Sequence, residues 1–295
     1  HLRYFLAVAQ EGHITRAAER LHMSQPPLST QIQALEREVG TPLFTRTPHG
    51  VELTEAGVAF QVEAAQILGA TDRARDAALR AARGETGHLR VGFTGSAAFN
   101  PVVAATIRNQ RRNWPSVRVT LEELNTTRLT EALLGGQIDA AFLRPGQAGI
   151  AGLTLHRLPD EPMKVVLPVS HPLASRCRIP LSALAHEPFV LFPRAVGLSL
   201  YDAIESACSA AGFTLQAHQE APQISSVVNL VAAELGVSIV PASITQMAVQ
   251  GVRYVDISGA RPLATLALAH RSDDSRAIVQ HFVALRPGAR SATSS

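Results

Sequence analysis

AAERLHMSQPPLS, residues 17–29, has the pattern of one helix, a short turn and the start of a second helix. Ala17 and Ala18 are small, so another helix can cross the first one closely. Pro26 and Pro27 fall in the first turn of the second helix, where a backbone N–H would have no intrahelical partner. The segment predicts a helix-turn-helix, around which the rest of the chain can be interpreted.

Apolar spacing on either side of this unit predicts a winged helix-turn-helix domain over residues 1–54. A preceding helix is indicated by apolar residues three and four apart, namely Leu2, Phe5, Leu6 and Ala9. The second helix of the unit is expected to bury one face, which carries Leu28, Ile32, Leu35 and Val39. Residues 43–46 and 51–53 predict two short strands around a turn at 47–50, which together make a β-wing.

The outward face of the second helix has side chains suited to DNA. This face carries Pro26, the hydroxyls of Ser29 and Thr30, the amide of Gln33 and, near the end of the helix, Arg37. The prolines remove donors that Ser24 would otherwise cap, which leaves its hydroxyl for a phosphate. We expect the helix from Gln25 onward to enter the major groove and Arg46 of the wing to reach the minor groove. An ordinary three-helix core is the alternative on this segment alone.

Bulk charge does not decide between these alternatives. The formal net charge is +3, but residues 1–60 hold five arginines against six glutamates. The local placement of polar side chains therefore has to carry the argument for DNA binding.

Length and composition favour two folded domains in a cytoplasmic protein. The chain has 295 residues, of which 46% are hydrophobic and 17% are charged. No apolar run approaches the roughly 18 residues that cross a bilayer, and the N-terminal residues do not have the layout of a signal peptide. Cys177 and Cys208 are the only cysteines, and no metal-ligand spacing is present. We expect no disulfide, no metal and no cofactor.

Residues 55–83 predict one long helix with a dimerisation seam. A 3.5-residue repeat runs along it through Phe60, Ala64, Ile67, Thr71, Ala74, Ala78 and Ala81. At 1.5 Å per residue the helix would be roughly 43 Å long, which is too long and too one-sided to lie unpaired in water. We expect a dimer through this linker helix, followed by a hinge at residues 84–87, Gly-Glu-Thr-Gly.

The rest of the chain predicts an α/β domain of two lobes over residues 88–287. Buried-type strands at 89–93, 117–121 and 138–142 alternate with helical stretches at about 97–111 and 127–134, which predicts a parallel sheet with helices on both faces. A second lobe is indicated by strands at 163–167, 189–192 and 236–241 and by helices near 199–211 and 224–235. The last strand, 264–270, and a following helix are expected to return to the first lobe. Residues 288–295 are expected to form a disordered tail.

Polar residues at the carboxyl ends of the first-lobe strands predict a site for a small anion. Ser96 and Thr126 each open a helix after a strand, and Arg144 follows the third strand. Plain helix capping would explain Ser96 or Thr126 singly, and Arg144 could be a structural ion-pair partner. Their joint placement favours a carboxylate between the lobes. The expected apolar wall consists of Pro193, Leu200 and Val227.

The first sixty residues resemble the signature of LysR-type transcriptional regulators. The match comprises residues 17–29, Leu35-Glu36, Gly40 and 53–57. Thr30 departs from it, because close relatives often have Arg there, and one phosphate or guanine contact is therefore expected to be missing. The resemblance implies a bacterial activator that binds duplex DNA as a homotetramer. It also implies a winged helix-turn-helix joined by the linker helix to an effector domain similar to periplasmic solute-binding proteins.

The effector domain is most similar to the aromatic-catabolism branch of that family, whose members respond to muconates, chloromuconates or benzoates. The similarity rests on residues 91–96, 130–133, 191–193, 230–233 and 240–243. It implies that Ser96, Thr126 and the backbone around Leu200 contact the effector. Leu200 replaces an aromatic residue of muconate-responsive relatives and Asn125 replaces a glycine, so the resemblance does not choose one acid.

Other classes of function have less support. The sequence has no GxSxG around Ser96, no P-loop, no GxGxxG and no HExxH, so we do not expect an enzyme. A free-standing two-lobed solute-binding protein or ligand-binding enzyme is the main alternative, and the first sixty residues argue against it. An architectural DNA-binding protein would leave the α/β domain unexplained.

Overall fold

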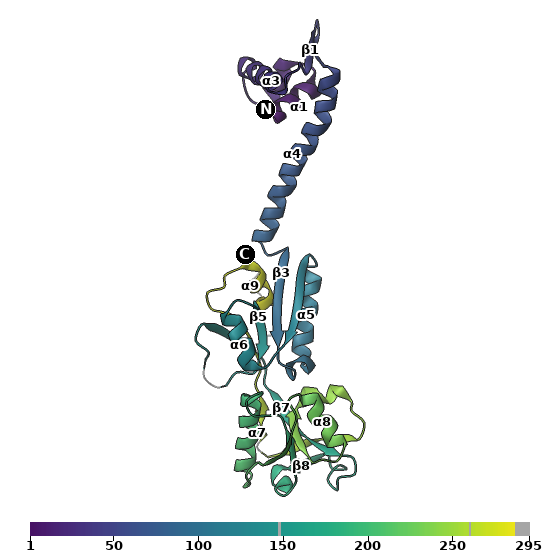
Figure 1. The fold of residues 1–295 in the computed structure, drawn as a ribbon, viewed down its shortest axis with the longest axis vertical. Coiled ribbons are helices and arrows are strands. Elements are labelled where there is room, and N and C mark those ends of the chain that lie inside the picture. Colours follow the sequence, from purple (N-terminus) through teal and green to yellow (C-terminus); the bar gives the residue numbers. More distant parts are fainter. Residues whose placement is uncertain (147–148, 260, 287–295) are drawn as a thin grey trace. The chain divides into compact units, whose positions relative to one another are not determined.

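The computed structural model describes residues 1–146, 149–259 and 261–286 (Figure 1). The chain divides into two compact units, His1–Arg80 and Ala81–Ser295. The predicted tail, residues 288–295, lies outside the described residues. Within the described ranges, no helix combines the length and the hydrophobicity needed to cross a membrane.

The first unit is a winged helix-turn-helix, as predicted. Its elements are α1 (Leu2–Glu11), α2 (Ile14–Arg20), α3 (Gln25–Val39), β1 (Phe44–Thr47), β2 (Gly50–Leu53) and the start of α4 (Glu55–Ala82). β1 and β2 pair as an antiparallel wing. Phe5 is fully buried at the centre of the core, with its ring 5.1 Å from that of Phe44 and 5.0 Å from that of Phe60.

Two details of the predicted burial are wrong in this unit. Val39 is 39% exposed, because it is the last residue of α3 and lies beyond the core that buries Leu35. Phe60 and Ala64, predicted to lie in the dimer seam, pack instead into the core of the winged domain. The part of α4 that is free for a partner therefore begins after Ala64.

The first lobe of the second unit, lobe I, contains a five-stranded sheet of order β4-β3-β5-β14-β6. Its strands are β3 (Gly87–Phe93), β4 (Val117–Glu123), β5 (Ala140–Leu143), β6 (Leu153–Arg157) and β14 (Ala267–Arg271). β3 is parallel to β4 and β5, whereas β14 is antiparallel to β5 and β6. The prediction of a parallel sheet is right for the strands on which it rests, β3, β4 and β5, whereas β14, which returns from the second lobe, runs in the opposite direction.

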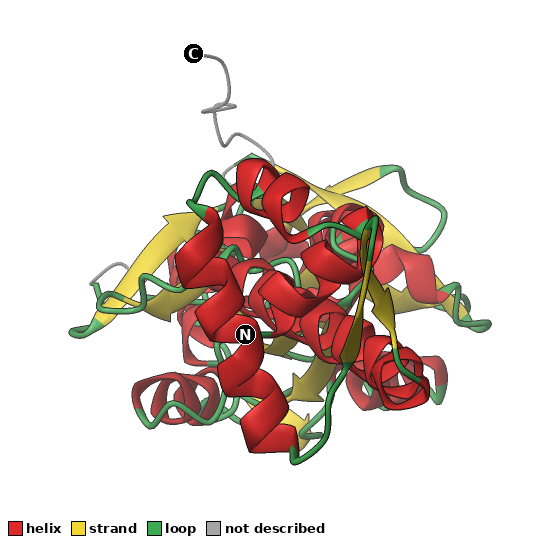
Figure 2. Cartoon of the chain, turned by 90° about the horizontal axis from the view of Figure 1, so that it is seen from above, coloured by secondary structure: helices red, strands yellow, loops and turns green. Residues whose placement is uncertain are grey.

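Helices cover both faces of the lobe I sheet. α5 (Pro101–Asn113) and α9 (Ala277–Ala284) pack on the face that carries Phe142, and α6 (Thr126–Leu134) packs on the other face. Figure 2 colours the helices red and the strands yellow in a view of the chain from above. The helix predicted over 97–111 is divided, since η1 (Ala97–Phe99) ends before Pro101 and Asn100 caps α5.

Lobe II is built around a second mixed sheet of order β11-β7-β12-β8, with β13 also paired to β7. These strands are β7 (Glu161–Pro168), β8 (Arg178–Pro180), β11 (Ser238–Pro241), β12 (Val252–Ser258) and β13 (Leu263–Ala264). A parallel pair, β9 (Phe189–Leu191) and β10 (Ala217–Glu220), lies beside it. The lobe also contains η2 (Leu181–Leu184), α7 (Leu198–Ala210), α8 (Ile224–Ala232) and η3 (Ala242–Met247).

The chain crosses between the lobes in two segments. The first crossing joins β6 to β7 and the second joins β13 to β14, so the single strand predicted over 264–270 is two strands in different sheets. The backbone N–H of Leu158 in the first crossing donates to the carbonyl of Leu266 in the second at 2.9 Å. Both leucines are buried, so the two crossings meet inside the protein at this bond.

Candidate functional site

The predicted DNA-reading residues lie at the surface of the first unit. Ser29 is half-buried, and the others are exposed: Ser24, Gln25, Pro26, Thr30, Gln33, Arg37 and Arg46. Ser24 makes no side-chain cap on α3. The Thr30 hydroxyl donates to the Pro26 carbonyl at 3.1 Å, and the Arg37 Nε donates to the Gln33 carbonyl at 3.3 Å.

Glu36, which sequence reasoning did not single out for a role, fixes the wing to α3. Its carboxylate accepts hydrogen bonds from the backbone N–H of Leu43 at 2.8 Å and of Phe44 at 3.0 Å. These N–H groups belong to the segment that starts the wing, so the wing keeps a fixed position beside α3. The Leu35-Glu36 pair in the signature was the available signal.

A cavity of about 450 Å³ lies between the two lobes. From lobe I it is lined by Thr94, Gly95, Ser96, Ala98, Phe99, Glu123, Leu124 and Asn125. From lobe II it is lined by Phe192, Val196, Gly197, Leu200, Pro222, Gln223, Ile224 and Ser225. A cavity of this size, mostly apolar with a few polar groups, fits a small organic ligand.

The structure brings some of the predicted effector residues to the cavity. Ser96 and Leu200 line it, whereas Thr126 and Pro193 are not among the described residues that line it. The assignment of Val227 to the wall is wrong, because Val227 is fully buried in the lobe II core and Ile224, one turn earlier on α8, faces the cavity instead.

Arg144 is a structural ion-pair partner, the alternative that the sequence left open. It is 4% exposed, and its Nη2 lies 3.0 Å from the Glu161 Oε1 of lobe II. Burial lowers the pKa of Arg144, while the carboxylate of Glu161 opposes that shift. The buried guanidinium therefore acts through its neighbours rather than by direct contact with a ligand.

The contact between Arg144 and Ser96 fixes the role of the serine hydroxyl. The Arg144 Nε donates to the Ser96 Oγ at 2.7 Å. Because a guanidinium has donors only, the Ser96 oxygen is the acceptor in this bond. The Ser96 proton is then available for an acceptor in the cavity, such as a carboxylate.

No cationic side chain lines the cavity among the described residues, so backbone N–H groups are the donors that could favour an anion there. Glu123 is the one ionisable side chain among the lining residues just named. α7 and α8 begin at the cavity without a side-chain cap, and α6 is capped by the Asn125 Oδ1, which accepts from the Arg128 N–H at 2.9 Å. Uncapped N–H groups at helix N-termini favour an anion.

Several lining residues were missed by the sequence analysis, notably Phe99, Phe192, Val196 and Ile224. The similarity at residues 191–193 points to this segment, but the wall residue in it is Phe192 and not the predicted Pro193. Phe192 reaches the cavity because its ring packs over Gly197, where an added Cβ would lie 2.7 Å from the ring. That close approach depends on the tertiary fold and is not visible in the sequence.

Two family models together match nearly all of the described chain. The model described as "Bacterial regulatory helix-turn-helix protein, lysR family" matches residues 1–58, and "LysR substrate binding domain" matches residues 82–286. The chain is 42% identical to the uncharacterized HTH-type transcriptional regulator YnfL of Escherichia coli (strain K12), over 88% of this chain and 86% of that protein. It is 38% identical to the HTH-type transcriptional regulator BudR of Raoultella terrigena, over 96% and 98%.

The solved structures that are similar to this chain agree with the family models. The chain is similar to CbnR, a LysR family transcriptional regulator, with a TM-score of 0.83, 30% identity and coverage of 96% and 98% of the two chains. It is equally similar to full-length CbnR complexed with its target DNA, with a TM-score of 0.83, 29% identity and coverage of 97% and 96%. The BenM effector binding domain with its effector benzoate matches with a TM-score of 0.59, 25% identity and coverage of 67% and 89%.

Proposed function

Because the chain belongs to the LysR family of DNA-binding transcriptional regulators, we propose that it controls a nearby promoter when a small acid occupies the cavity between its lobes. The observation that carries the proposal is the Ser96 hydroxyl, which accepts from the buried Arg144 and has its own proton free at the cavity. The relatives are named as regulators, and the function is regulation rather than catalysis.

The effector is a small carboxylate, from an aromatic pathway or a dicarboxylic acid. Ser96 donates to the carboxylate, and Leu200 forms part of the apolar wall. Thr126, the other predicted donor, follows the lining residue Asn125 at the start of α6, and its hydroxyl oxygen accepts from the Arg144 N–H at 3.4 Å. Phe192 and Phe99 offer flat surfaces for an aromatic body. The similar BenM effector binding domain has benzoate as its effector, which supports an aromatic acid here.

DNA is bound through α3 in the major groove and the wing in the neighbouring minor groove. The proposed contacts are Ser24, Gln25, Pro26, Ser29, Thr30, Gln33, Arg37 and Arg46. Their exposure and the free Ser24 hydroxyl support this assignment. Residues 1–54 would form the DNA-binding domain and 88–287 the effector domain, in the cytoplasm of a bacterium.

The linker helix, residues 55–83, would pair with that of a second copy. Residues 70–82 of α4 are exposed throughout, and the alanines at 74, 78 and 81 let two helices approach closely. Such dimers would pair further into a tetramer, and residues 84–87 would serve as the hinge.

A thermal-shift titration of the full chain tests the effector proposal, with benzoate and cis,cis-muconate as probes. A ligand that binds only the folded state raises the melting temperature. We expect at least one acid to raise it in the wild type, and Ser96→Ala to weaken that acid at least tenfold, or about 1.4 kcal/mol. Ser182→Ala, at an exposed serine outside the cavity, is the control. An equal response of wild type and Ser96→Ala would place the acid elsewhere.

A further inference from the structure

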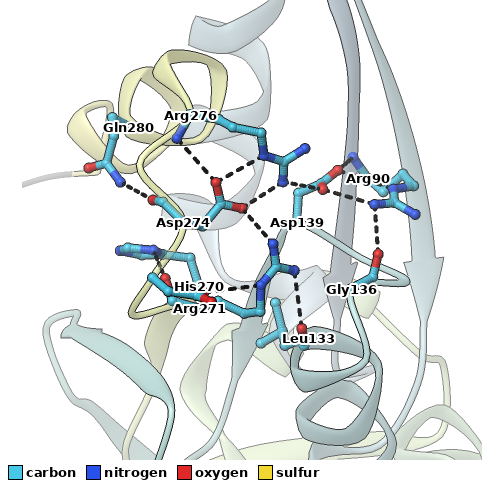
Figure 3. A network of polar contacts seen from close by, with 10 residues as sticks. Arg90, Leu133, Gly136, Asp139, His270, Arg271, Asp274, Arg276 and Gln280 are labelled. Carbon is cyan, nitrogen blue, oxygen red and sulfur yellow. Dashed lines mark hydrogen bonds and ion pairs between the residues drawn. The ribbon is translucent and has the colours of Figure 1, made fainter.

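A polar network built on two buried carboxylates joins the strands and helices of lobe I (Figure 3). We call it the arginine-aspartate clasp, and it consists of Arg90, Asp139, Arg271, Asp274 and Arg276. The Arg276 Nη2 lies 2.7 Å from the Asp139 Oδ1 and 2.6 Å from the Asp274 Oδ2. The Arg90 Nη2 donates to the Asp139 Oδ1 at 3.0 Å, and the Arg271 Nη2 donates to the Asp274 Oδ2 at 3.2 Å.

Both carboxylates of the clasp are buried and ionised. Their side chains are each 1% exposed. Burial by itself would raise the pKa of Asp139, but hydrogen bonds from Arg90 and Arg276 outweigh it and hold that pKa below its usual value. Arg276 likewise lowers the pKa of Asp274. A buried charge that loses its partner is strongly destabilising, so the clasp holds its elements in one arrangement.

Several elements reach from the clasp to the proposed effector cavity. β3 carries Arg90, and Thr94, the residue after β3, lines the cavity. Asn125 caps the first turn of α6 and lines the cavity, while the carbonyl of Leu133 near the other end of α6 accepts from the Arg271 Nη1 at 3.3 Å. A nine-residue helix such as α6 is roughly 13 Å long and moves as a rigid body.

The clasp also includes the residue before α9, the helix against which Gly84 packs. Gly84, just after α4, is buried with a φ of +67°, and an added Cβ would lie 2.4 Å from the backbone N of Ile278 in α9. Arg276 is the N-cap residue of α9, and α9 has no side-chain cap of its own. The predicted hinge thus begins at a packed contact that depends on the position of α9.

We infer that the arginine-aspartate clasp couples the cavity to the junction that follows the linker helix, so that a change at either place alters the other. The regulatory meaning of this coupling rests on the proposed function of the cavity. An acid that binds one arrangement of β3 and α6 more tightly shifts the equilibrium of the clasp and of the Gly84 contact toward that arrangement. The size of the shift is set by the difference in the acid's affinity for the two arrangements. Coupling of this kind is reciprocal, so it can be measured without the acid.

Hydrogen exchange of the full chain, without effector or DNA, tests the inference on Arg276→Gln. We expect amides of residues 94–98, 126–130 and 81–84 to exchange at least tenfold faster in the variant. Arg194→Gln, which breaks the exposed pair between Arg194 and Asp202, is the matched control and should change none of these segments.

Faster exchange confined to α9 would make the clasp a local support and overturn the inference. Equally faster exchange in β12 of lobe II would report global unfolding of Arg276→Gln, and unchanged exchange at 94–98 and 126–130 in Gly84→Ala would then overturn the inference. Gly84→Ala perturbs the other end and should speed exchange at 94–98 and 126–130 as well, which keeps the test decisive if Arg276→Gln fails to fold. Neither variant uses a ligand, so failure here leaves the effector proposal standing.

Discussion

His156 makes the stability of the folded chain sensitive to mild acid. Burial lowers the pKa of His156 to about 4, and the positive charge of Arg286 adds to the effect. In the unfolded chain the imidazole takes up its proton near pH 6.5. Between these values the unfolded state binds more protons, so the free energy of unfolding falls as the pH decreases from 6.5 to 4.

Urea unfolding at a series of pH values checks this prediction. We expect His156→Gln to flatten the dependence between pH 6.5 and 4. His218→Gln, at an exposed histidine, should leave the wild-type slope unchanged. If all three proteins lose stability in parallel, another group causes the acid sensitivity.

Single residues show where sequence reasoning reaches its limit. The order in which Ser96 and Arg144 follow their strands was enough to place Ser96 at the cavity. The partner of Arg144 is Glu161, 17 positions later in another lobe, and no local pattern identifies a contact of that kind. Val227 and Ile224 lie on the same helix, and only the packed core decides which of them faces the ligand.

The first prediction at the scale of an element is that the outer face of α3 reads the DNA bases. The double variant Ser29→Ala and Gln33→Ala removes polar groups from that face while Leu28, Ile32 and Leu35 keep the helix packed. Each lost base contact should weaken specific binding by roughly 1–3 kcal/mol. Electrophoretic shifts on the protein's own promoter measure it, with Gln10→Ala on α1 as control. Unchanged specificity in the double variant would assign base reading to another surface.

A second prediction at the scale of an element concerns the exposed part of α4. Replacing Ala74 and Ala78 by Glu would bury like charges along the proposed seam, which a helix pair tolerates poorly without partners. We expect light scattering to show a smaller assembly than the wild type. Arg75→Glu, off the seam on the same helix, controls for the change in net charge. A wild-type mass for the double variant would locate the dimer contact elsewhere.

Elements were predictable where their signals are local. Asn100 and Pro101 together mark the start of α5, since the Asn100 Oδ1 accepts from the Val102 N–H at 3.0 Å and Pro101 opens the helix. By contrast, residues 264–270 look like one strand because no glycine, proline or aspartate interrupts them. Their division into β13 and β14 follows from two different pairing partners, β7 and β5, which are set by the tertiary fold.

At the scale of the whole molecule, the stability of the fold depends on the ion pair that joins the two lobes. Arg144 of lobe I and Glu161 of lobe II have side chains only 3% and 13% exposed. Glu161→Gln leaves the guanidinium without its charge partner, and we expect a loss of about 3–5 kcal/mol in the free energy of unfolding. Urea denaturation measures it, beside Arg194→Gln, whose exposed pair should contribute no more than about 1 kcal/mol. Comparable losses in the two variants would contradict the structural role of Arg144.

The two crossing segments restrict how the lobes can move. Because Leu158 and Leu266 are hydrogen-bonded to each other inside the protein, sliding one lobe past the other would stretch both segments and break that bond. A rotation about the line on which the segments lie changes neither length. We therefore expect the lobes to move by rotation rather than by sliding, and an acid bound in the cavity to favour one angle between them.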